Sequence, residues 1–265
     1  MGISRSSFYH KTNKEKVTSD LEWKKLIVEI NGDFPGYGYR RIERELRSKG
    51  HLINHKKVLR LMKKFGIESC HVRKKNQFQV YQKLNDGRPF ENLLRDFEVT
   101  ATGQAWATDI TFIRLESGFV YLAAIIDIYS RVVVGWAISK KMDYVLCINA
   151  LDSALSRRTI KEGCIHHSDQ GAQYRSEEYV RYLKESGFRI SMSDKGSPTQ
   201  NAFIESFFKT LKYEEIYFKG YKTFHDVMKK LPKFIEEVYN AKRLHSSLGY
   251  KSPLAYEKEL TDKAS

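Results

Sequence analysis

The sequence predicts an α/β domain with a mixed five-stranded sheet flanked by helices, preceded by a small all-helical region. Three consecutive strand-like runs from residue 105 indicate an antiparallel meander, and the strand–helix–strand–helix order after them indicates parallel crossovers. Charge is distributed unevenly over the 265 residues: residues 1–100 hold 22 Lys and Arg against 12 Asp and Glu, and the whole chain has a net charge of +14. This imbalance predicts that the protein binds a polyanion, mainly through residues 1–100.

Residues 38–67 predict two short helices separated by a turn. Ile42 and Leu46 form one apolar stripe, Gly50 ends that helix, and Asn54 can cap the next. The apolar positions of the second helix are Val58, Leu61 and Phe65. This order of helix, glycine-containing turn and helix is typical of a helix-turn-helix.

Basic residues surround both of these stripes, and we expect them to contact DNA phosphates. The candidates are Arg40, Arg41, Arg44, Lys56, Lys57 and Arg60. The alternative is a solvated charged face on a plain helical hairpin. We assign residues 1–75 to this basic helical region and residues 76–104, with Gly87 and Pro89, to a linker.

The predicted sheet domain spans residues 105–258, including a helical extension at its C-terminal end. Its elements follow in chain order as strands at 106–115, 119–130 and 131–140, a helix at 143–158, a strand at 164–169, a helix at 176–187 and a strand at 189–194. We expect the first and fourth strands to lie side by side, because a crossover tends to place the later strand next to the first strand of the meander.

A last helix is predicted from residue 197. Ser197 and Gln200 have capping-box spacing, and Pro198 suits the first helical position. One face is expected to be a buried stripe of Phe203, Phe207 and Leu211. A neighbouring edge carries Glu205, Lys209 and Lys212. Taken alone, this is an ordinary amphipathic helix with a Glu–Lys pair one turn apart.

Three carboxylates occupy positions from which they can converge: Asp109 in the first strand, Asp169 at the end of the fourth, and Glu205. Without basic partners they would repel one another, so convergence predicts a divalent metal, and carboxylate oxygens suit Mg²⁺ or Mn²⁺. Two such ions can promote phosphodiester cleavage and transfer. Asp127 is the main rival acid and is expected to bond local backbone or Arg131.

Other site types are weakly supported by the sequence. Cys70, Cys147 and Cys164 are too few and scattered for a disulfide framework, which suggests a reducing, cytosolic location. A zinc site built on His51, His55 and Cys70 lacks a fourth ligand. The most apolar span, residues 119–138, carries Asp127 and Arg131 inside it, which argues for strands and against a membrane helix.

Five segments in order resemble one family, the second-reading-frame transposases of bacterial insertion sequences of the IS-three type, which are grouped with retroviral integrases in the ribonuclease-H-like superfamily. The segments are WATDIT, YLAAIIDIYSRVVVGW, IHHSDQGAQY, NAFIESFFKTLK and YNAKRLHSSLGYKSP. The resemblance covers nearly the whole chain and implies an integrase catalytic core. It also implies that Asp109, Asp169 and Glu205, with 35 residues between the last two, are the catalytic, metal-binding acids.

Further expectations follow from this resemblance. Lys209 and Lys212 match lysines used on DNA ends, and His167 and Asn201 are expected to support the acids. Gln200 departs from the family, which usually has an aspartate there. The implied protein acts on bacterial DNA in the cytoplasm at the nucleoid, as a homo-oligomer, possibly with an upstream-frame helix-turn-helix protein that recognises the element's ends. The alternatives are a ribonuclease-H-like nuclease that does not join DNA and a non-catalytic DNA-binding regulator.

Overall fold

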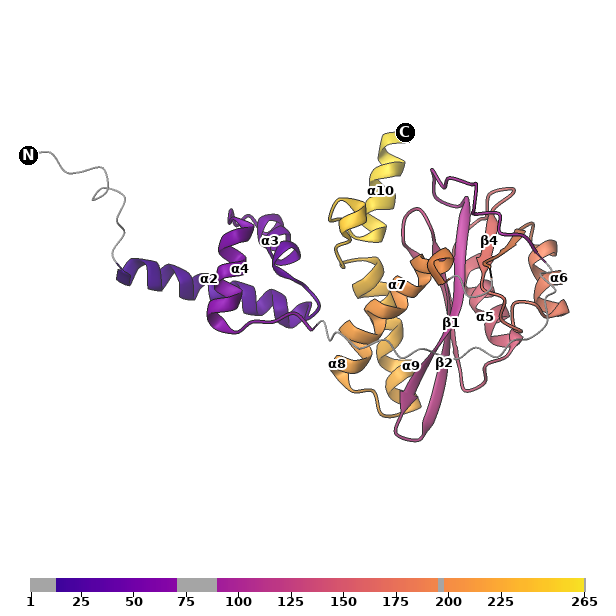
Figure 1. Ribbon diagram of the computed structural model, residues 1–265, viewed down its shortest axis with the longest axis horizontal. Helices are drawn as coiled ribbons and strands as arrows, with labels where there is room; N and C mark the ends of the chain where they lie inside the picture. The colour runs from indigo at the N-terminus through magenta and orange to yellow at the C-terminus, as the bar shows by residue number, and fades with distance from the viewer. Residues whose placement is uncertain (1–12, 71–89, 195–197, 265) are drawn as a thin grey trace, which may run out of the picture. The chain divides into compact units, whose positions relative to one another are not determined.

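The computed structural model describes residues 13–70, 90–194 and 198–264 of the chain (Figure 1). The chain forms two compact units, Met1–Arg73 and Lys74–Ser265. The first unit is helical in its described part, and the second contains the sheet. These are the two structural classes that the sequence predicts for the two parts of the chain.

The N-terminal unit consists of α2 (Asn13–Asp33), α3 (Tyr39–Ser48) and α4 (His55–Phe65). The sequence predicts the last two of these helices, and α2 packs against both. Ile27 and Ile30 of α2 are buried with the predicted stripes of α3 and α4. Phe65, predicted to be buried, is only half-buried, and Met62 is buried in the same helix instead. A third helix therefore completes a core that a helical pair could not enclose.

Capping contacts fix the turn between α3 and α4. Gly50 has φ +85°, a left-handed conformation that a side chain disfavours, and it follows α3 as predicted. The side-chain oxygen of Asn54 accepts a hydrogen bond from the backbone N–H of Lys56 at 2.8 Å, which confirms the predicted cap. Gly66 ends α4 with φ +63°. Local sequence signals thus set the boundaries of both helices.

The sheet has five strands in the order β3-β2-β1-β4-β5. β1, β2 and β3 form the predicted antiparallel meander, while β4 runs parallel to β1 and β5 runs parallel to β4. The predicted mixed sheet and the central pairing of the first and fourth strands are both confirmed. The strands are β1 (Ala105–Leu115), β2 (Gly118–Asp127), β3 (Val133–Ser139), β4 (Ile165–Ser168) and β5 (Arg189–Met192).

Helices cover both faces of the sheet (Figure 1). On one face, α5 (Tyr144–Leu155) and α6 (Glu177–Glu185) bury their apolar sides against even-numbered β1 residues such as Trp106. On the other face, α7 (Ala202–Leu211) packs against odd-numbered β1 residues such as Ile113. Alternate side chains of β1 therefore pack into two separate hydrophobic cores, one on each face of the sheet, as expected for a central strand.

A helical extension follows α7 and packs on the same face. Its elements are η2 (Lys212–Ile216), α8 (Tyr217–Lys219), α9 (Phe224–Lys233), η3 (Phe234–Asn240), η4 (Ser246–Leu248) and α10 (Pro253–Ala264). Asn240 exchanges two hydrogen bonds with the backbone of Val133 in β3, at 2.9 and 3.0 Å. Arg243 donates two hydrogen bonds to Glu214 at 2.7 Å, and both side chains are buried. The Asn240 bonds fasten the extension to the sheet, and the Arg243–Glu214 pair joins two parts of the extension to each other.

The segment predicted as a linker contains structure in its described part. Within residues 90–104, Leu93, Leu94 and Val99 pack against the core on the α7 side of the sheet. The backbone N–H of Leu93 donates to Ser191 Oγ at 2.9 Å, which joins this segment to β5. Residues 71–89 lie outside the described residues. In the part of the chain that the structure describes, no helix has the length and apolarity needed to cross a membrane.

We expect Gly135→Ala to destabilise the sheet unit, because α5 lies directly against β3 at this glycine. A Cβ at residue 135 would lie 2.4 Å from the carbonyl oxygen of Ala150 and 2.6 Å from the Cβ of Ala154. Forced overpacking of this kind costs typically ~1–3 kcal/mol or more. Thermal unfolding should show a clear loss for Gly135→Ala and almost none for Gly32→Ala, a position where no atom lies within 4 Å of the added methyl. Equal melting temperatures for wild type and Gly135→Ala would contradict this packing.

Candidate active site

Parallel pairing of β1 and β4 brings two of the three predicted acids together. Ala107 of β1 is level with His167 of β4. Continuing this register by two residues on each chain segment places Asp109 level with Asp169, which directly follows β4. The meeting point is the C-terminal end of β4, and sites in open α/β sheets collect at such strand ends.

The start of α7 is tied to β1 beside Asp109. Asn201 is buried, and its Nδ2 donates a hydrogen bond to the carbonyl oxygen of Thr108 at 3.1 Å. Glu205 follows one turn later on α7 and is exposed. The Asn201 bond therefore fixes the entry of the helix that carries the third acid relative to the strand that carries the first.

The three acids lie within electrostatic reach of one another. Burial, the charge of Asp169 and then that of Glu205 raise the pKa of Asp109, against opposing effects from the Ile110 N–H and Lys212, and the net result is a pKa of about 7. Burial also raises the pKa values of Asp169 and Glu205. Backbone N–H groups hold both aspartates: Ile110 donates to Asp109 at 2.7 Å and Gly171 donates to Asp169 at 2.9 Å. Asp109 therefore sits where additional negative charge is unfavourable.

The donor set suits a hard divalent cation, although its oxygens are not gathered around one point. Within residues 13–70, 90–194 and 198–264, no three His, Cys, Asp or Glu side chains are close enough to hold one ion. The mutual repulsion recorded in the raised pKa of Asp109 is what a cation would relieve. The side-chain oxygen of Asn201 is buried without a hydrogen-bond partner, which leaves an acceptor at the edge of this group. Carboxylate oxygens are the ligands that Mg²⁺ and Mn²⁺ prefer.

α7 differs from its prediction in start and in phase. A 3₁₀ turn at Pro198–Asn201 precedes it, and α7 itself begins at Ala202. Ser197 lies outside the described residues, and the Gln200 side chain accepts from the Asp194 N–H at 2.6 Å and donates to its carboxylate at 2.9 Å. The capping-box role predicted for Gln200 is therefore wrong, because this side chain is engaged with the end of β5.

The predicted buried stripe of α7 is wrong at its first member. Phe203 is 36% exposed, because the tighter 3₁₀ turn and the packing against the sheet set the rotation of the helix. The buried residues of α7 are Ile204, Phe207, Phe208 and Leu211. Lys209 is exposed on the same side as Glu205. Lys212 lies near enough to Asp109 to lower its pKa and also places its ammonium 4.7 Å from the centre of the Phe112 ring.

His167 lies behind the acids in a buried network. Its Nδ1 is 2.8 Å from Ser191 Oγ, and that hydroxyl oxygen already accepts the N–H of Leu93, so we assign the hydroxyl proton to the bond with His167. Burial lowers the pKa of His167 to about 4, so the ring is neutral at physiological pH. Its position supports the end of β4 rather than reaching the acids directly.

Asp127 has the local role expected of it. Its Oδ1 accepts from the N–H groups of Tyr129 and Ser130, each at 2.9 Å, and its Oδ2 accepts from Gly103 N–H at 2.7 Å. With its oxygens engaged in this way, Asp127 holds the β2–β3 connection and belongs to the scaffold.

The cations predicted to bind DNA lie on the N-terminal unit, several with intramolecular contacts. Arg40 is exposed beside Tyr39, Arg44 lies 3.6 Å from Glu43, and Lys57 lies over Trp23. Arg41 is half-buried beside Tyr37, while Lys56 is exposed at the start of α4. These cations occupy α3 and the first part of α4.

Arg60 is held by an acid that sequence reasoning missed. The carboxylate of Asp20 in α2 accepts hydrogen bonds from Nη1 and Nη2 of Arg60 at 3.2 and 2.9 Å and from Nζ of Lys64 at 2.9 Å. These contacts lower the pKa of Asp20. Forty residues separate Asp20 from Arg60, so no local pattern could have indicated the pair.

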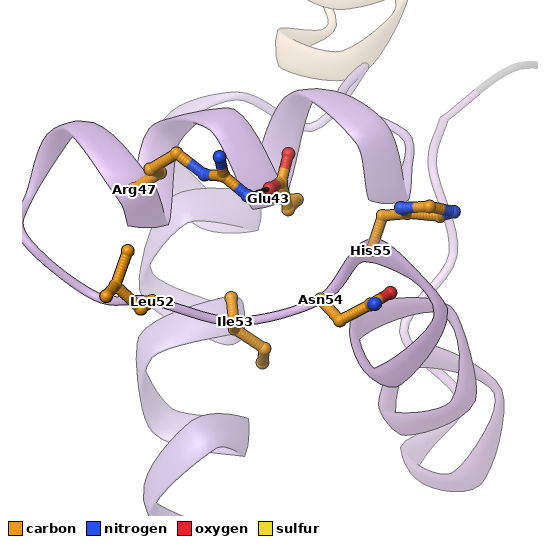
Figure 2. A pocket seen from close by; sticks show the side chains of 6 residues that line it. All are labelled: Glu43, Arg47, Leu52, Ile53, Asn54 and His55. Carbon is orange, nitrogen blue, oxygen red and sulfur yellow. Dashed lines mark ion pairs between the residues drawn. The ribbon is translucent and has the colours of Figure 1, made fainter.

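A hollow of about 320 Å³ lies at the turn of the helix-turn-helix. Figure 2 shows the side chains that line it, which come from α3, from the turn and from the start of α4: Glu43, Arg47, Leu52, Ile53, Asn54 and His55. Arg47 pairs with the buried Glu43 at 2.6 Å, which neutralises the acid in this wall. The hollow therefore adds no unpaired negative charge to the basic face.

The five-stranded mixed sheet with helices on both faces, together with the helix-turn-helix unit, is the architecture of an integrase-like core with an N-terminal HTH-like domain. Family models agree: an integrase core domain matches residues 99–198, a second integrase core domain matches residues 186–253, and an HTH-like domain matches residues 19–76. The fold is similar to a chain of the simian T-cell lymphotropic virus intasome in complex with PP2A regulatory subunit B56 gamma, with a TM-score of 0.50 and 16% identity over 87% of this chain and 73% of that one.

Relatives identify the family within this class. The chain is 36% identical to the transposase for insertion sequence element IS904 of Lactococcus lactis subsp. lactis (strain IL1403), over 94% of this chain and 98% of the relative. It is 39% identical to the transposase InsF for insertion sequence IS3A of Escherichia coli (strain K12), over 83% of this chain and 76% of the relative. The chain belongs to the family of insertion-sequence transposases.

We expect the metal-free protein to lose stability as pH rises through neutrality. The folded pKa of Asp109, about 7, lies above its ordinary value of 3.8, so the folded state binds the extra proton between these values and stability falls as pH rises across them. At pH 8, Asp109→Asn should therefore have a higher melting temperature than wild type, with an unfolding free energy greater by roughly 1–3 kcal/mol. Near pH 4 the two proteins should have the same stability. Thermal unfolding across this range measures the difference.

Two comparisons make this measurement specific. Asp96→Asn removes an exposed acid and should not change the pH dependence. Mg²⁺ should stabilise wild type and have little effect on Asp109→Asn. If the stability of Asp109→Asn depends on pH in the same way as that of wild type, the raised pKa does not belong to Asp109 and the prediction is wrong.

Proposed function

We propose that this transposase cleaves DNA and joins it through Asp109, Asp169 and Glu205. The observation that carries the proposal is the raised pKa of Asp109, which arises from burial and from the charges of the other two acids. Three carboxylates from β1, from the end of β4 and from α7 would not be kept this close for stability, because their repulsion destabilises the fold. Such clusters are typical of functional sites.

The three acids would hold Mg²⁺ or Mn²⁺, as two ions. When bound, such ions activate an attacking oxygen and stabilise the leaving oxygen of a phosphodiester. Asp109 would lose its proton when a cation binds. Asn201 keeps the start of α7 against β1, and His167 supports the end of β4. The roles of Asn201 and His167 are therefore to position the acids.

The reaction consists of two in-line displacements at phosphorus. In the first, a water oxygen bonds to phosphorus, the bond to the 3′ oxygen breaks, and a free 3′-hydroxyl remains at the element end. In the second, that hydroxyl attacks another phosphodiester, forming a new DNA linkage and releasing a 3′ oxygen there. No covalent bond to the protein is required. Each step exchanges one P–O bond for another, so positioning and charge stabilisation supply the catalysis.

DNA contact is divided between the two units in this proposal. Lys209 and Lys212 bind the backbone next to the acids, supported by the exposure of Lys209 and the nearness of Lys212 to Asp109. In the N-terminal unit, the phosphate contacts are Arg40, Arg41, Arg44, Lys56, Lys57 and Arg60. We keep residues 1–75 as the basic helix-turn-helix region, 76–104 as the connection and 105–258 as the catalytic core with its extension.

Assembly follows from the reaction, because two DNA ends must be brought together. We propose a homo-oligomer on DNA, acting in the bacterial cytoplasm at the nucleoid, with an upstream-frame helix-turn-helix protein as a further partner for recognising the ends. A nuclease without joining activity would cut the same DNA and yield no branched or circular product. A non-catalytic regulator would bind DNA with or without the acids and would not respond to Mg²⁺.

Glu205→Gln should abolish cleavage and joining while DNA binding remains. We expect an activity loss greater than the roughly 10–100-fold typical of residues that only support metal ligands. The measurement is strand transfer with labelled duplexes that carry the terminal sequences flanking the coding region, in Mg²⁺ and in Mn²⁺. Glu178→Gln, which neutralises an exposed acid on α6, is the control. Full joining by Glu205→Gln would defeat the assignment.

Lys56→Ala and Arg60→Ala separate phosphate contact from folding in the N-terminal unit. Each should reduce the slope of log affinity against log salt by about 0.9, the value for one lost phosphate contact on duplex DNA. Arg60→Ala should also lower the melting temperature, because it leaves the buried Asp20 with only Lys64. Lys56→Ala should leave it unchanged. Unchanged salt slopes for both variants would assign these cations to a solvated face instead.

A further inference from the structure

The hairpin of β1 and β2 extends past the other strands of the sheet (Figure 1). β4 pairs with β1 only over Ala105–Ala107, and β3 pairs with β2 no further toward the hairpin turn than Tyr121. On the face that α5 covers, the last hairpin residues packed against the core are Ile110 and Tyr121, and both are only half-buried. The end of the hairpin therefore leaves this face of the sheet open to solvent.

Two phenylalanine rings lie on this open face. Phe112 of β1 is 47% exposed and Phe119 of β2 is 51% exposed. Phe112 is paired with Tyr121 across the strands, so Phe119 is its diagonal neighbour on the same face. The two ring centres are 5.6 Å apart, and the ring planes meet at 85°. Exposed apolar side chains that gather in this way, unlike scattered single ones, indicate a binding surface.

Cations flank both rings. The ammonium of Lys212, which follows α7, lies 4.7 Å from the centre of the Phe112 ring. Arg114 is paired with Phe119 across the strands, so it lies on the same face, and it is exposed. In the part of the chain that the structure describes, Arg114 forms no ion pair. Exposed aromatic rings combined with cations are the composition of sites that bind unpaired nucleic acid strands.

Lys212 connects the aromatic pair with the acids. The same ammonium lowers the pKa of Asp109, so it lies within electrostatic reach of that acid. Asp109 faces the α7 side of β1 and Phe112 faces the opposite side, and the edge of β1 between them is not paired with β4. Lys212 therefore reaches from the α7 side past this unpaired edge to the open face. A DNA strand that crosses the edge would pass from the acids to the rings.

The distance along β1 corresponds to a few nucleotides. Because a strand rises about 3.3 Å per residue, Phe112 lies roughly 10 Å from Asp109, and Phe119, which is level with Arg114, lies roughly 16 Å from it. One DNA strand advances about 3.4 Å per nucleotide, so these lengths correspond to about three to five nucleotides. A base inside a duplex has both faces covered by its neighbours, so only an unpaired or displaced base can stack on a side chain.

We propose that Phe112 and Phe119 bind an unpaired base of the DNA strand, about three to five nucleotides from the phosphodiester that reacts at the acids. The inference rests on the proposed function. One ring stacks on the base while the other contacts the edge of that base, and Lys212 and Arg114 bind neighbouring phosphates. A second copy of the chain fits this face less well, because it would bring the same cations to it. The two rings position the strand and take no part in bond exchange.

The test compares bases with abasic sugars in an unpaired segment of DNA. Duplexes with the terminal sequence flanking the coding region carry a single-stranded 3′ or 5′ overhang in which one nucleotide at a time is abasic. Binding to the full-length protein is measured in Ca²⁺, which carboxylates also bind. At one or two positions of the overhang, the abasic sugar should weaken binding to wild type by about fivefold or more, the loss expected for one stacked base.

Variants at the rings show whether they cause this difference. Phe119→Leu and Phe112→Leu keep apolar volume without a planar ring, so each should bind the complete and the abasic DNA with nearly equal affinity. Phe119→Tyr keeps the ring and should retain the difference. Leu254→Ala, which removes a side chain that is 40% exposed on α10, is the control and should behave as wild type.

Each outcome decides the inference. It is overturned if no abasic position weakens wild type, if both leucine variants lose as much affinity at each position as wild type does, or if they change only the oligomeric state of the protein. If Phe119→Leu does not fold, Phe112→Leu decides in the same way. A protein that shows the base effect but never joins DNA would overturn the proposed function and leave the base contact standing. Joining without the base effect would do the reverse.

Discussion

The parallel pairing of β4 with β1 is the interaction on which the candidate active site depends. β4 is only four residues long, and on either side it pairs with β1 and with β5. Its position between these two strands is set by backbone hydrogen bonds and by the burial of every residue in it. Because a shift of one residue would turn each side chain to the opposite face, the register also determines that Asp169 emerges level with Asp109.

Two contributions of different size then place α7. Its four buried apolar side chains each contribute roughly 1.5–3 kcal/mol of burial, so they hold the helix on the sheet. The bond from Asn201 to the Thr108 carbonyl is worth only about 1 kcal/mol, but it is directional. Burial therefore decides that α7 covers this face, and the hydrogen bond decides where along β1 the helix begins.

The site so built is unfavourable in electrostatic terms. Asp109 is buried, and the charges of Asp169 and Glu205 both act on it. Unpaired negative charge on a rigid scaffold is consistent with a site whose missing partner is a cation.

The sequence by itself determined the strands of the sheet, the helices between them and the two helices α3 and α4, but it did not indicate α2. Alternating apolar runs identified the meander, and the cap at Asn54 and the glycine at residue 50 bounded the helices. The assignment of Asp109, Asp169 and Glu205 as the catalytic acids stays a prediction. The N-terminal and linker boundaries remain predictions. Local signals were sufficient for these features because each depends on residues a few positions apart.

Only the tertiary structure decided the features that depend on distant residues. The phase of α7, and with it the exposure of Phe203, followed from packing against the sheet and not from the helical repeat. Two contacts had no signal in the sequence: the ion pair of Asp20 with Arg60 and the hydrogen bonds between Gln200 and Asp194. The sequence also did not indicate that Arg131 Nη1 lacks a hydrogen-bond partner. The physical reason is that these contacts form between elements whose separation is fixed by the summed burial of the whole core, which no local pattern of residues encodes.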